Sequence, residues 1–309
     1  MSRFRRSVRY TRRRRSDNSS SKIVAVFAVI AALIVCLILS VVIGIALGKK
    51  AEQYKSGSKY RFDYEPYISG EKTVKAVDAF YYVLGADARG YVRSGEGDLS
   101  FCIRDSEGVL SFDSVTAANV GIAQNESGLS LTEEIEYLHK LGGYACAYIC
   151  STAFECEDEY LREIYKAYEI ALISEAADAG VDDILIVGLE INADNISEIE
   201  KYVSDASRAA GNAPLGVLTS REVISAADDG VYLAGRVRSA CDYLALDLRA
   251  FEVTEESEEA NSSALEELID SVKYYIEAYG LRMVLSRENS EFRGELIELG
   301  VKNIQIIAE

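Results

Sequence analysis

The run DILIVGL at residues 183–189 is one of eight short apolar runs that decide the fold of this chain of 309 residues. These runs are rich in Val, Ile, Leu and Tyr, and they alternate with longer stretches in which apolar residues recur at helical spacing. This alternation is typical of βα units with a parallel sheet. In chain order the eight runs occupy residues 74–84, 98–103, 144–150, 183–189, 214–219, 242–248, 281–286 and 301–307.

Eight strands alternating with helices predict an α/β fold, a (β/α)8 TIM-like barrel. The alternative is an open doubly wound sheet, but such sheets usually have fewer strands and a nucleotide-binding loop. Only 13 residues separate the first run from the second, and four of them are glycines, Gly85, Gly90, Gly95 and Gly97. The first helix of the barrel is therefore expected to be vestigial.

Two of the connecting stretches show clear apolar stripes. The first comprises Leu161, Ile164, Tyr165, Tyr168 and Leu172, and the second comprises Leu265, Leu268, Ile269, Val272 and Ile276. The pairs Ser130 with Glu133 and Ser263 with Glu266 have the spacing of a capping box, which predicts a helix start at each serine.

The N-terminal part of the chain predicts a membrane anchor. Residues 23–47 contain no charged residue, and a stretch of this length can cross a hydrocarbon core of about 30 Å. We expect a cytoplasmic basic tail at residues 1–22, a single transmembrane helix at 23–48, a linker at 49–72 and the barrel at 73–309. The tail holds nine of the 33 basic residues and one of the 50 acidic ones. This excess of positive charge predicts a cytoplasmic N-terminus that contacts anionic lipid, and a barrel on the outer side of the cell membrane.

The remaining charge restricts the partners of the barrel. Residues 49–309 hold 24 basic and 49 acidic residues, a formal charge of −25. Such a surface repels nucleic acid, so no nucleic-acid partner is expected. No phosphate loop follows Gly85 or Gly95, so no nucleotide is expected either.

The inventory of reactive side chains points away from metals and cofactors. The chain has one histidine, His139, on a helical stretch that should expose it, and no CxxC pair. We therefore expect no metal site and no cofactor. The cysteines outside the membrane span are odd in number and lie mostly in apolar runs, which favours buried thiols, although one bridge from Cys102 to Cys146 or Cys150 stays open.

Carboxylates at the ends of strands are then the remaining catalytic candidates, because barrel enzymes carry their function at the C-terminal ends of the strands. Asp105 follows the second run, Glu190 follows the fourth, and Asp247 lies near the end of the sixth. Side chains of alternate strands share layers of a barrel interior, so these three could converge. Gly188 and Ala245, each two residues earlier, would leave space for a pocket beneath Glu190 and Asp247. A pair of carboxylates in a pocket is what hydrolysis of a glycosidic bond requires.

Other polar residues near strand ends could hold the hydroxyl groups of a substrate: Tyr82, Arg249, Arg287 and Glu288. The alternative is that these carboxylates and their neighbours are simply solvated or cap helices, since a chain with 50 acidic residues places some of them at strand ends by chance. Tryptophan, on which sugars commonly stack, does not occur, although 20 tyrosines could replace it.

Several segments together resemble the glycoside-hydrolase-like barrel domain of bacterial exported and membrane-anchored proteins. They are VKAVDAFYYVLG, FCIRDSEGVLSFDS, SLTEEIEYLHKLGGYACAYI and SEAADAGVDDILIVGLEIN, and the likeness extends over about residues 73–309. The resemblance implies a (β/α)8 barrel acting on a polysaccharide or a glycan of the cell envelope. Asp105 and Gly108 match the family's pattern after the second strand, and Asp242 and Tyr243 match the start of the sixth.

The sequence departs from that family at several strand ends. Cys102 and Ile103 stand where the family has an earlier acid, and ILIVGLEIN replaces its aspartate, arginine, phenylalanine and proline after the fourth strand. Glu190 and Asp247 are thus candidates by position alone. Two functions follow: an anchored glycoside hydrolase that uses paired carboxylates, or a catalytically inactive barrel that binds a glycan or a protein at the cell surface. A mouth filled with apolar side chains would favour a surface for a partner protein.

Overall fold

A computed structural model describes residues 67–69, 72–89, 97–120, 128–225, 229–251 and 258–308. The predicted basic tail and transmembrane helix, residues 1–48, lie outside these ranges, as does most of the predicted linker. No helix within these ranges combines the length and the apolar character that crossing a membrane requires. The predicted anchor at residues 23–48 therefore stays a prediction.

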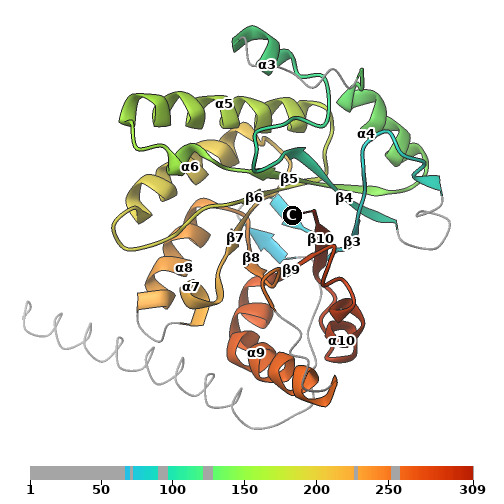
Figure 1. The fold of residues 1–309 in the computed structure, drawn as a ribbon, viewed down its shortest axis with the longest axis vertical. Helices are drawn as coiled ribbons and strands as arrows, with labels where there is room; N and C mark the ends of the chain where they lie inside the picture. The colour runs from blue at the N-terminus through green and yellow to red at the C-terminus, as the bar shows by residue number, and fades with distance from the viewer. Residues whose placement is uncertain are drawn as a thin grey trace, which may run out of the picture. The chain divides into compact units, whose positions relative to one another are not determined.

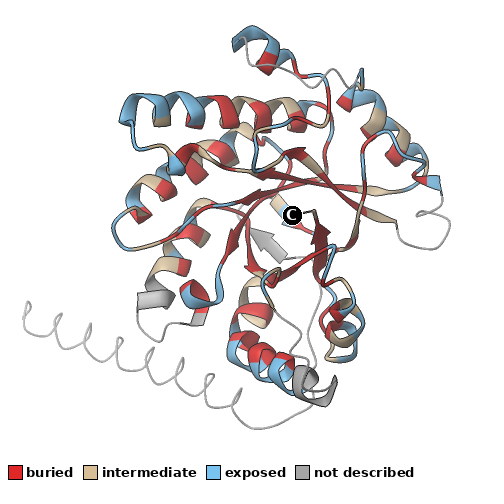
Figure 2. Ribbon diagram, viewed as in Figure 1, coloured by how far each residue is buried: buried red, intermediate tan, exposed pale blue. Residues whose placement is uncertain are grey.

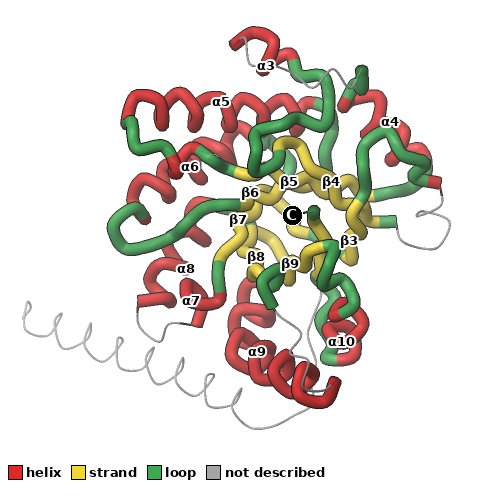
Figure 3. The backbone as a smooth tube through the Cα atoms, in the orientation of Figure 1, coloured by secondary structure: helices red, strands yellow, loops and turns green. Residues whose placement is uncertain are grey.

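Eight parallel strands close into a barrel, in the order β10-β3-β4-β5-β6-β7-β8-β9 (Figure 1). Figure 3 shows this ring of strands end-on, with loops and helices around it. Each strand lies within or overlaps one of the eight apolar runs, so the predicted barrel is confirmed. The strands are β3 (Asp78–Tyr81), β4 (Asp98–Arg104), β5 (Tyr144–Cys150), β6 (Asp183–Val187), β7 (Leu215–Thr219), β8 (Tyr243–Asp247), β9 (Arg282–Ser286) and β10 (Ile304–Ile307).

Helices follow most of the strands and turn their apolar sides toward the ring, as the burial colours in Figure 2 show. The helices are α3 (Val115–Val120), α4 (Leu131–Lys140), α5 (Glu159–Asp178), α6 (Ile196–Ala209), α7 (Arg221–Ser225), α8 (Asp229–Ala240), α9 (Glu258–Tyr279) and α10 (Phe292–Glu298), with a short 3₁₀ turn η1 (Ala153–Glu155) before α5. The predicted vestigial helix falls largely on residues 90–96, which lie outside the described ranges.

One of the two predicted apolar stripes is fully buried, and the other is buried only in its second half. All five residues of the stripe in α9 are buried, as predicted. In α5 the prediction is wrong for the first half, because Leu161, Ile164 and Tyr165 are exposed and only Tyr168 and Leu172 are buried. A helix of 20 residues is about 30 Å long, whereas a strand of five residues such as β6 spans only about 17 Å. The first turns of α5 therefore extend past the sheet that would bury them.

Of the two predicted helix starts, one is confirmed and the other is wrong. Ser130 caps α4, and its side chain accepts a hydrogen bond from the N–H of Glu133, as expected. Ser263 does not begin a helix, because α9 already starts at Glu258. His139 is exposed on α4, as predicted, and lies 2.9 Å from Asp182 through its Nε2.

A short antiparallel hairpin precedes the barrel, formed by β1 (Tyr67–Ser69) and β2 (Lys72–Val74). The Nζ of Lys72 lies 3.1 Å from a carboxylate oxygen of Asp242 and donates to the carbonyl oxygen of Ala213 at 3.0 Å. Asp242 directly precedes β8, and Ala213 lies two residues before β7, so the hairpin lies at the end of the barrel where the strands begin. Residues 67–69 and 72 of this hairpin fall within the predicted linker at residues 49–72.

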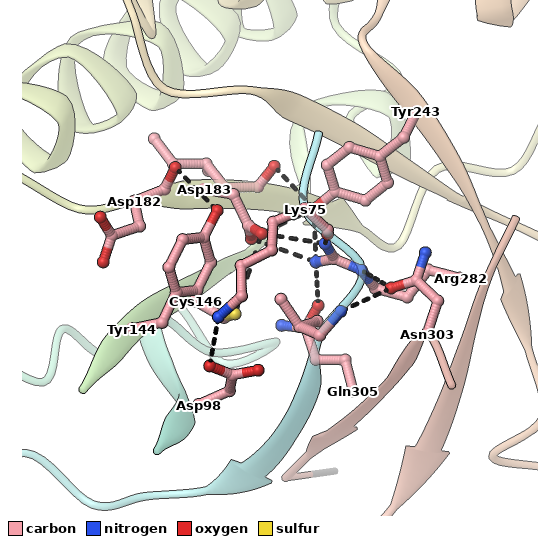
Figure 4. Close-up of polar contacts among 12 residues, drawn as sticks. Lys75, Asp98, Tyr144, Cys146, Asp182, Asp183, Tyr243, Arg282, Asn303 and Gln305 are labelled. Atoms are coloured by element: carbon pink, nitrogen blue, oxygen red, sulfur yellow. Dashed lines mark hydrogen bonds and ion pairs between the residues drawn. The ribbon is translucent and has the colours of Figure 1, made fainter. Parts of the chain in front are cut away.

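A buried polar cluster occupies the interior of the barrel at this same end (Figure 4). Asp183 begins β6 and Arg282 begins β9, and both side chains are almost completely buried. Two hydrogen bonds join them, Nη1 to Oδ1 at 3.1 Å and Nη2 to Oδ2 at 2.9 Å. Burial alone would lower the pKa of Arg282, but the neighbouring Asp183 carboxylate outweighs it and the pKa is raised. The guanidinium therefore stays charged in the core.

Four further groups complete the hydrogen bonds of Arg282, whose Nη2 donates to the carbonyl oxygen of Lys75 at 3.5 Å. Its Nη1 donates to the hydroxyl of Tyr243 and to the side-chain oxygen of Gln305, both at 2.9 Å, and its Nε donates to Asn303 Oδ1 at 3.1 Å. The guanidinium carbon also lies 4.2 Å from the centre of the Tyr243 ring. That ring occupies the space beside Gly216, where an added Cβ would come within 2.1 Å of it. The cluster thus joins four strands across the base of the barrel.

Removing one charge from this cluster should destabilise the barrel strongly. Asp183→Asn leaves Arg282 buried without a counter-charge, so we expect the free energy of unfolding to fall by about 3–5 kcal/mol. Urea unfolding followed by circular dichroism measures this change. The control is Glu136→Gln, which breaks the exposed pair with Lys140 and should cost less than about 1 kcal/mol. Equal effects of the two substitutions would contradict the role given to the cluster.

Candidate functional site

The C-terminal ends of all eight strands lie at the end of the barrel opposite the hairpin, because the strands are parallel. In barrels of this kind, binding and catalytic groups lie at that end. Of the seven residues proposed from the sequence, six follow a strand there and Asp247 is the last residue of β8, but the structure uses them in different ways.

Asp105 closes a turn directly after β4. Its Oδ1 accepts hydrogen bonds from the backbone N–H groups of Glu107 at 3.0 Å and Val109 at 2.8 Å. Its carbonyl oxygen accepts the N–H of Gly108, whose φ of +86° suits glycine. This carboxylate therefore has a structural task in the loop, whether or not it also contacts a ligand.

Asp247 and Arg249, proposed for separate roles, form one ion pair at the end of β8. Arg249 Nη2 lies 2.7 Å from Asp247 Oδ2, Arg249 Nε lies 3.0 Å from Oδ1, and the backbone N–H of Arg249 donates to Oδ1 at 2.9 Å. Both side chains are partly exposed. Both oxygens of the Asp247 carboxylate are therefore engaged by Arg249.

Glu190 is exposed on the loop after β6, and its carbonyl oxygen accepts a hydrogen bond from Asn195 Nδ2 at 2.7 Å. The expectation that Gly188 leaves space beneath it on the strand is wrong, because β6 ends at Val187. Gly188 has a φ of +87°, and a Cβ there would meet the carbonyl oxygen of Ser151 at 2.9 Å. Position 188 therefore requires glycine because the backbone makes a tight turn there. Within the described ranges, no hydrogen bond joins Asp105, Glu190 and Asp247 to one another.

Tyr82 does not face a ligand site. Its side chain is 1% exposed, and its hydroxyl donates to the carbonyl oxygen of Ala86 at 2.7 Å. Burial, together with the nearby Glu134 carboxylate, raises the pKa of this hydroxyl. Side chains alternate between the two faces of a strand, so the preceding residue, Tyr81, turns the other way and is half-buried.

The axis of the barrel is filled near its open end. Tyr148, Val187, Leu218 and Ile307 are all buried and belong to one apolar cluster. The backbone N–H of Ala308 donates to the Tyr148 hydroxyl at 3.0 Å, so the last described residue packs over this layer. Apolar side chains therefore occupy this layer of the barrel interior.

A pocket of about 230 Å³ lies instead at the rim of the barrel, beside the ends of β3, β9 and β10. We call it the rim pocket. Arg287 and Tyr81 provide its polar and aromatic groups, and the guanidinium carbon of Arg287 lies 5.9 Å from the centre of the Tyr81 ring. The residues that line it are Phe80, Tyr81, Val83, Ala86, Arg287, Ser290 and Ile306.

The sequence identified only Arg287 among these residues. The backbone of Arg287 is fixed, because its N–H donates to the carbonyl oxygen of Ile307 at 3.0 Å. Ser290 donates from its hydroxyl to the carbonyl oxygen of Arg287 at 2.9 Å. Alternation along β3 could have indicated Tyr81 in place of Tyr82, whereas no sequence signal marks Ser290. Glu288 is exposed on the same loop and does not line the pocket.

A second ion pair that the sequence did not indicate lies at the ends of β4 and β5. Arg104 Nη1 lies 3.1 Å from Glu169 Oε1, and both side chains are buried. Glu169 also accepts hydrogen bonds from the Ser151 hydroxyl at 2.7 Å, the Thr152 N–H at 2.9 Å and the Tyr202 hydroxyl at 2.8 Å. Four donors satisfy this carboxylate, so it joins strands to helices and has little capacity left for a ligand.

The cysteines carry no metal site or bridge in the part of the chain that the structure describes. All five, Cys102, Cys146, Cys150, Cys156 and Cys241, have free thiols. No group of three or more His, Cys, Asp or Glu side chains in the same ranges is arranged to hold a metal ion. Burial raises the pKa of the Cys150 thiol to about 11, although Arg249 opposes the rise, and burial raises the pKa of Cys102 and Cys146 further.

No protein-family model and no curated protein matches this chain. Among solved structures, the tryptophan synthase A-subunit of Pyrococcus furiosus is 12% identical, with a TM-score of 0.44, over 74% of this chain and 85% of its own. A D-psicose 3-epimerase is 13% identical, with a TM-score of 0.45, over 74% and 83%. A sugar phosphate isomerase/epimerase of Parabacteroides distasonis is 12% identical, with a TM-score of 0.40, over 78% and 91%. Likenesses of this size carry no information on what the chain does.

Alkylation of the thiols tests the burial that the structure gives them. At pH 8 a thiol with a pKa of about 11 is ionised in about one molecule in a thousand, and only the thiolate reacts. We expect iodoacetamide to modify Cys156, on the loop before α5, and to leave Cys102, Cys146, Cys150 and Cys241 unmodified until the chain is unfolded. Peptide mass spectrometry of the native and denatured protein measures both states. Rapid modification of Cys102 or Cys150 in the native protein would show that the barrel end is open.

Proposed function

We propose that this protein is a binding module that holds a glycan at the rim pocket and does not hydrolyse it. We further propose that residues 23–48 anchor it in the cell membrane, with the N-terminus in the cytoplasm and the barrel on the outer side. This is the inactive-barrel alternative drawn from the sequence, in its glycan-binding form and at a pocket that the sequence did not locate. Its protein-binding form is the second candidate, because apolar side chains fill the barrel axis near the strand ends.

The rim pocket is the observation that carries the binding proposal. It combines the aromatic rings of Phe80 and Tyr81 with the guanidinium of Arg287. Sugar rings present an apolar face and a rim of hydroxyl groups, so an aromatic surface beside a hydrogen-bond donor suits them. Its volume of about 230 Å³ is below the roughly 300–1,000 Å³ of pockets for drug-sized ligands, which fits a single ring.

The proposed carboxylates give less support to hydrolysis. A hydrolase needs one acid that is protonated and one that is ionised, on opposite sides of a glycosidic bond. Asp247 is paired with Arg249, and Asp105 accepts two backbone hydrogen bonds, so neither is an unoccupied carboxylate. Only Glu190 is exposed without such a partner among the described residues, and one carboxylate does not make a pair.

A glycan panel separates binding from hydrolysis. We expect the wild-type protein to bind at least one glycan on an array and to release no sugar from it above the buffer background. Glu190→Gln should leave that binding within about twofold, because Glu190 does not line the rim pocket. Sugar release by the wild type that disappears in Glu190→Gln would establish the hydrolase predicted from the sequence. Retention of a protein from the cell envelope, with no glycan bound, would favour a protein partner.

The anchor can be tested independently of the ligand. The apolar run at residues 23–47 should keep the full chain in the membrane fraction after extraction at alkaline pH. A chain that lacks residues 23–48 should move to the supernatant. Protease added to intact cells or spheroplasts should digest the barrel and spare the basic tail. Digestion of the tail in place of the barrel would reverse the proposed orientation.

A further inference from the structure

We propose that the rim pocket selects a sugar that carries a carboxylate, and that Arg287 binds this carboxylate while Tyr81 packs against the sugar ring. The inference rests on the proposed glycan-binding function and adds the chemical class of the ligand.

Arg287 differs from its neighbouring arginines in its lack of a counter-charge. At the end of β8, Arg249 is paired with Asp247, and at the start of α10, Arg293 Nε lies 2.7 Å from Asp78 Oδ1. The Arg287 guanidinium forms no ion pair with any carboxylate that the structure describes, and no acidic side chain lines the rim pocket. An arginine cannot lose its charge in a protein, so this pocket contains a permanent positive charge that a ligand can neutralise.

The geometry of Arg287 favours a planar anion. A guanidinium presents parallel N–H donors that match the two oxygens of a carboxylate, and such paired hydrogen bonds are stronger than those between neutral groups. The Tyr81 ring lies beside the guanidinium, so a ligand bound through its carboxylate would have its ring next to an aromatic face. Ser290 lines the same pocket, and its hydroxyl oxygen can still accept a hydrogen bond from a sugar hydroxyl.

The charge of the whole barrel region limits the ligand further. Residues 49–309 carry a formal charge of −25, which repels chains with many negative charges. A single carboxylate on one sugar ring gains the local attraction of Arg287 with less of this repulsion. We therefore infer a sugar with one carboxylate per ring, at a chain end or spaced along a mostly neutral glycan.

The test compares sugars that differ only in this group. The full chain in detergent is titrated with glucuronate, glucose, galacturonate, galactose and acetate, and binding is followed by isothermal titration calorimetry. We expect each uronate to bind at least tenfold more tightly than its neutral counterpart and more tightly than acetate. This preference should fall as salt is raised from 50 to 500 mM, because salt screens partly exposed charges.

Variants assign the preference to Arg287. Arg287→Gln should abolish the tenfold preference, and Arg287→Lys, which keeps the charge and loses the planar donors, should retain part of it. Arg208→Gln removes the same charge from an exposed site near the end of α6, far from the strand ends, and should leave the preference unchanged. Circular dichroism spectra that match the wild type show that each variant is folded.

The outcomes separate the inference from the function on which it rests. Equal affinity of the wild type for uronates and neutral sugars overturns the inference and leaves glycan binding intact. A preference that survives in Arg287→Gln also overturns it, because the carboxylate must then bind elsewhere. A wild-type chain that binds acetate but no sugar, or binds none of the five compounds, overturns the proposed function as well.

Discussion

The structure depends on one buried ion pair, between Arg282 and Asp183 in the base of the barrel. The two residues begin strands on different sides of the ring, and neither side chain has appreciable contact with water. A charged group in such a place is tolerated only if its hydrogen bonds are satisfied, and Tyr243, Gln305 and Asn303 satisfy those of Arg282. The pair therefore requires β8, β9 and β10 to keep their register relative to β6, which is also what closure of the ring requires.

This polar base has consequences for the opposite end. Above it the large side chains of Tyr148, Leu218 and Ile307 are buried in one apolar cluster, and the backbone of Ala308 contacts the Tyr148 hydroxyl. The rim pocket lies at this end of the barrel, next to β3, β9 and β10. Arg287 stands there, and no carboxylate that the structure describes pairs with it, whereas Arg249 and Arg293 each have such a partner.

The architecture could be predicted from the sequence because it repeats. The apolar runs are short, and a helical stretch follows most of them. Eight such runs correspond to the eight strands of the barrel. The candidate site could be predicted only in part. The sequence does not show what a carboxylate at a strand end contacts. Asp105 closes a turn, whereas Asp247 binds an arginine. Tyr82 and Tyr81 are adjacent, and a shift of one residue reverses which of them faces the interior.

Packing distances explain the other differences. The stripe in α5 correctly shows an amphipathic helix, but periodicity does not reveal how much sheet lies beneath it, so the exposure of Leu161 and Ile164 could not be foreseen. From the sequence, Gly188 is expected to leave space for a pocket beneath Glu190. Its real constraint is the carbonyl oxygen of Ser151, which directly follows β5 and lies 37 positions earlier in the sequence, and only the folded chain brings the two together.

The N-terminal hairpin has a mechanical consequence. It is held by three residue pairs, and Tyr67, where the chain arrives, lies opposite Val74, from which the chain continues toward β3. A force that pulls on the chain before Tyr67 would therefore separate the residue pairs of β1 and β2 one after another, before the strands of the ring separate. The opened hairpin would lengthen the chain by a short extension at low force.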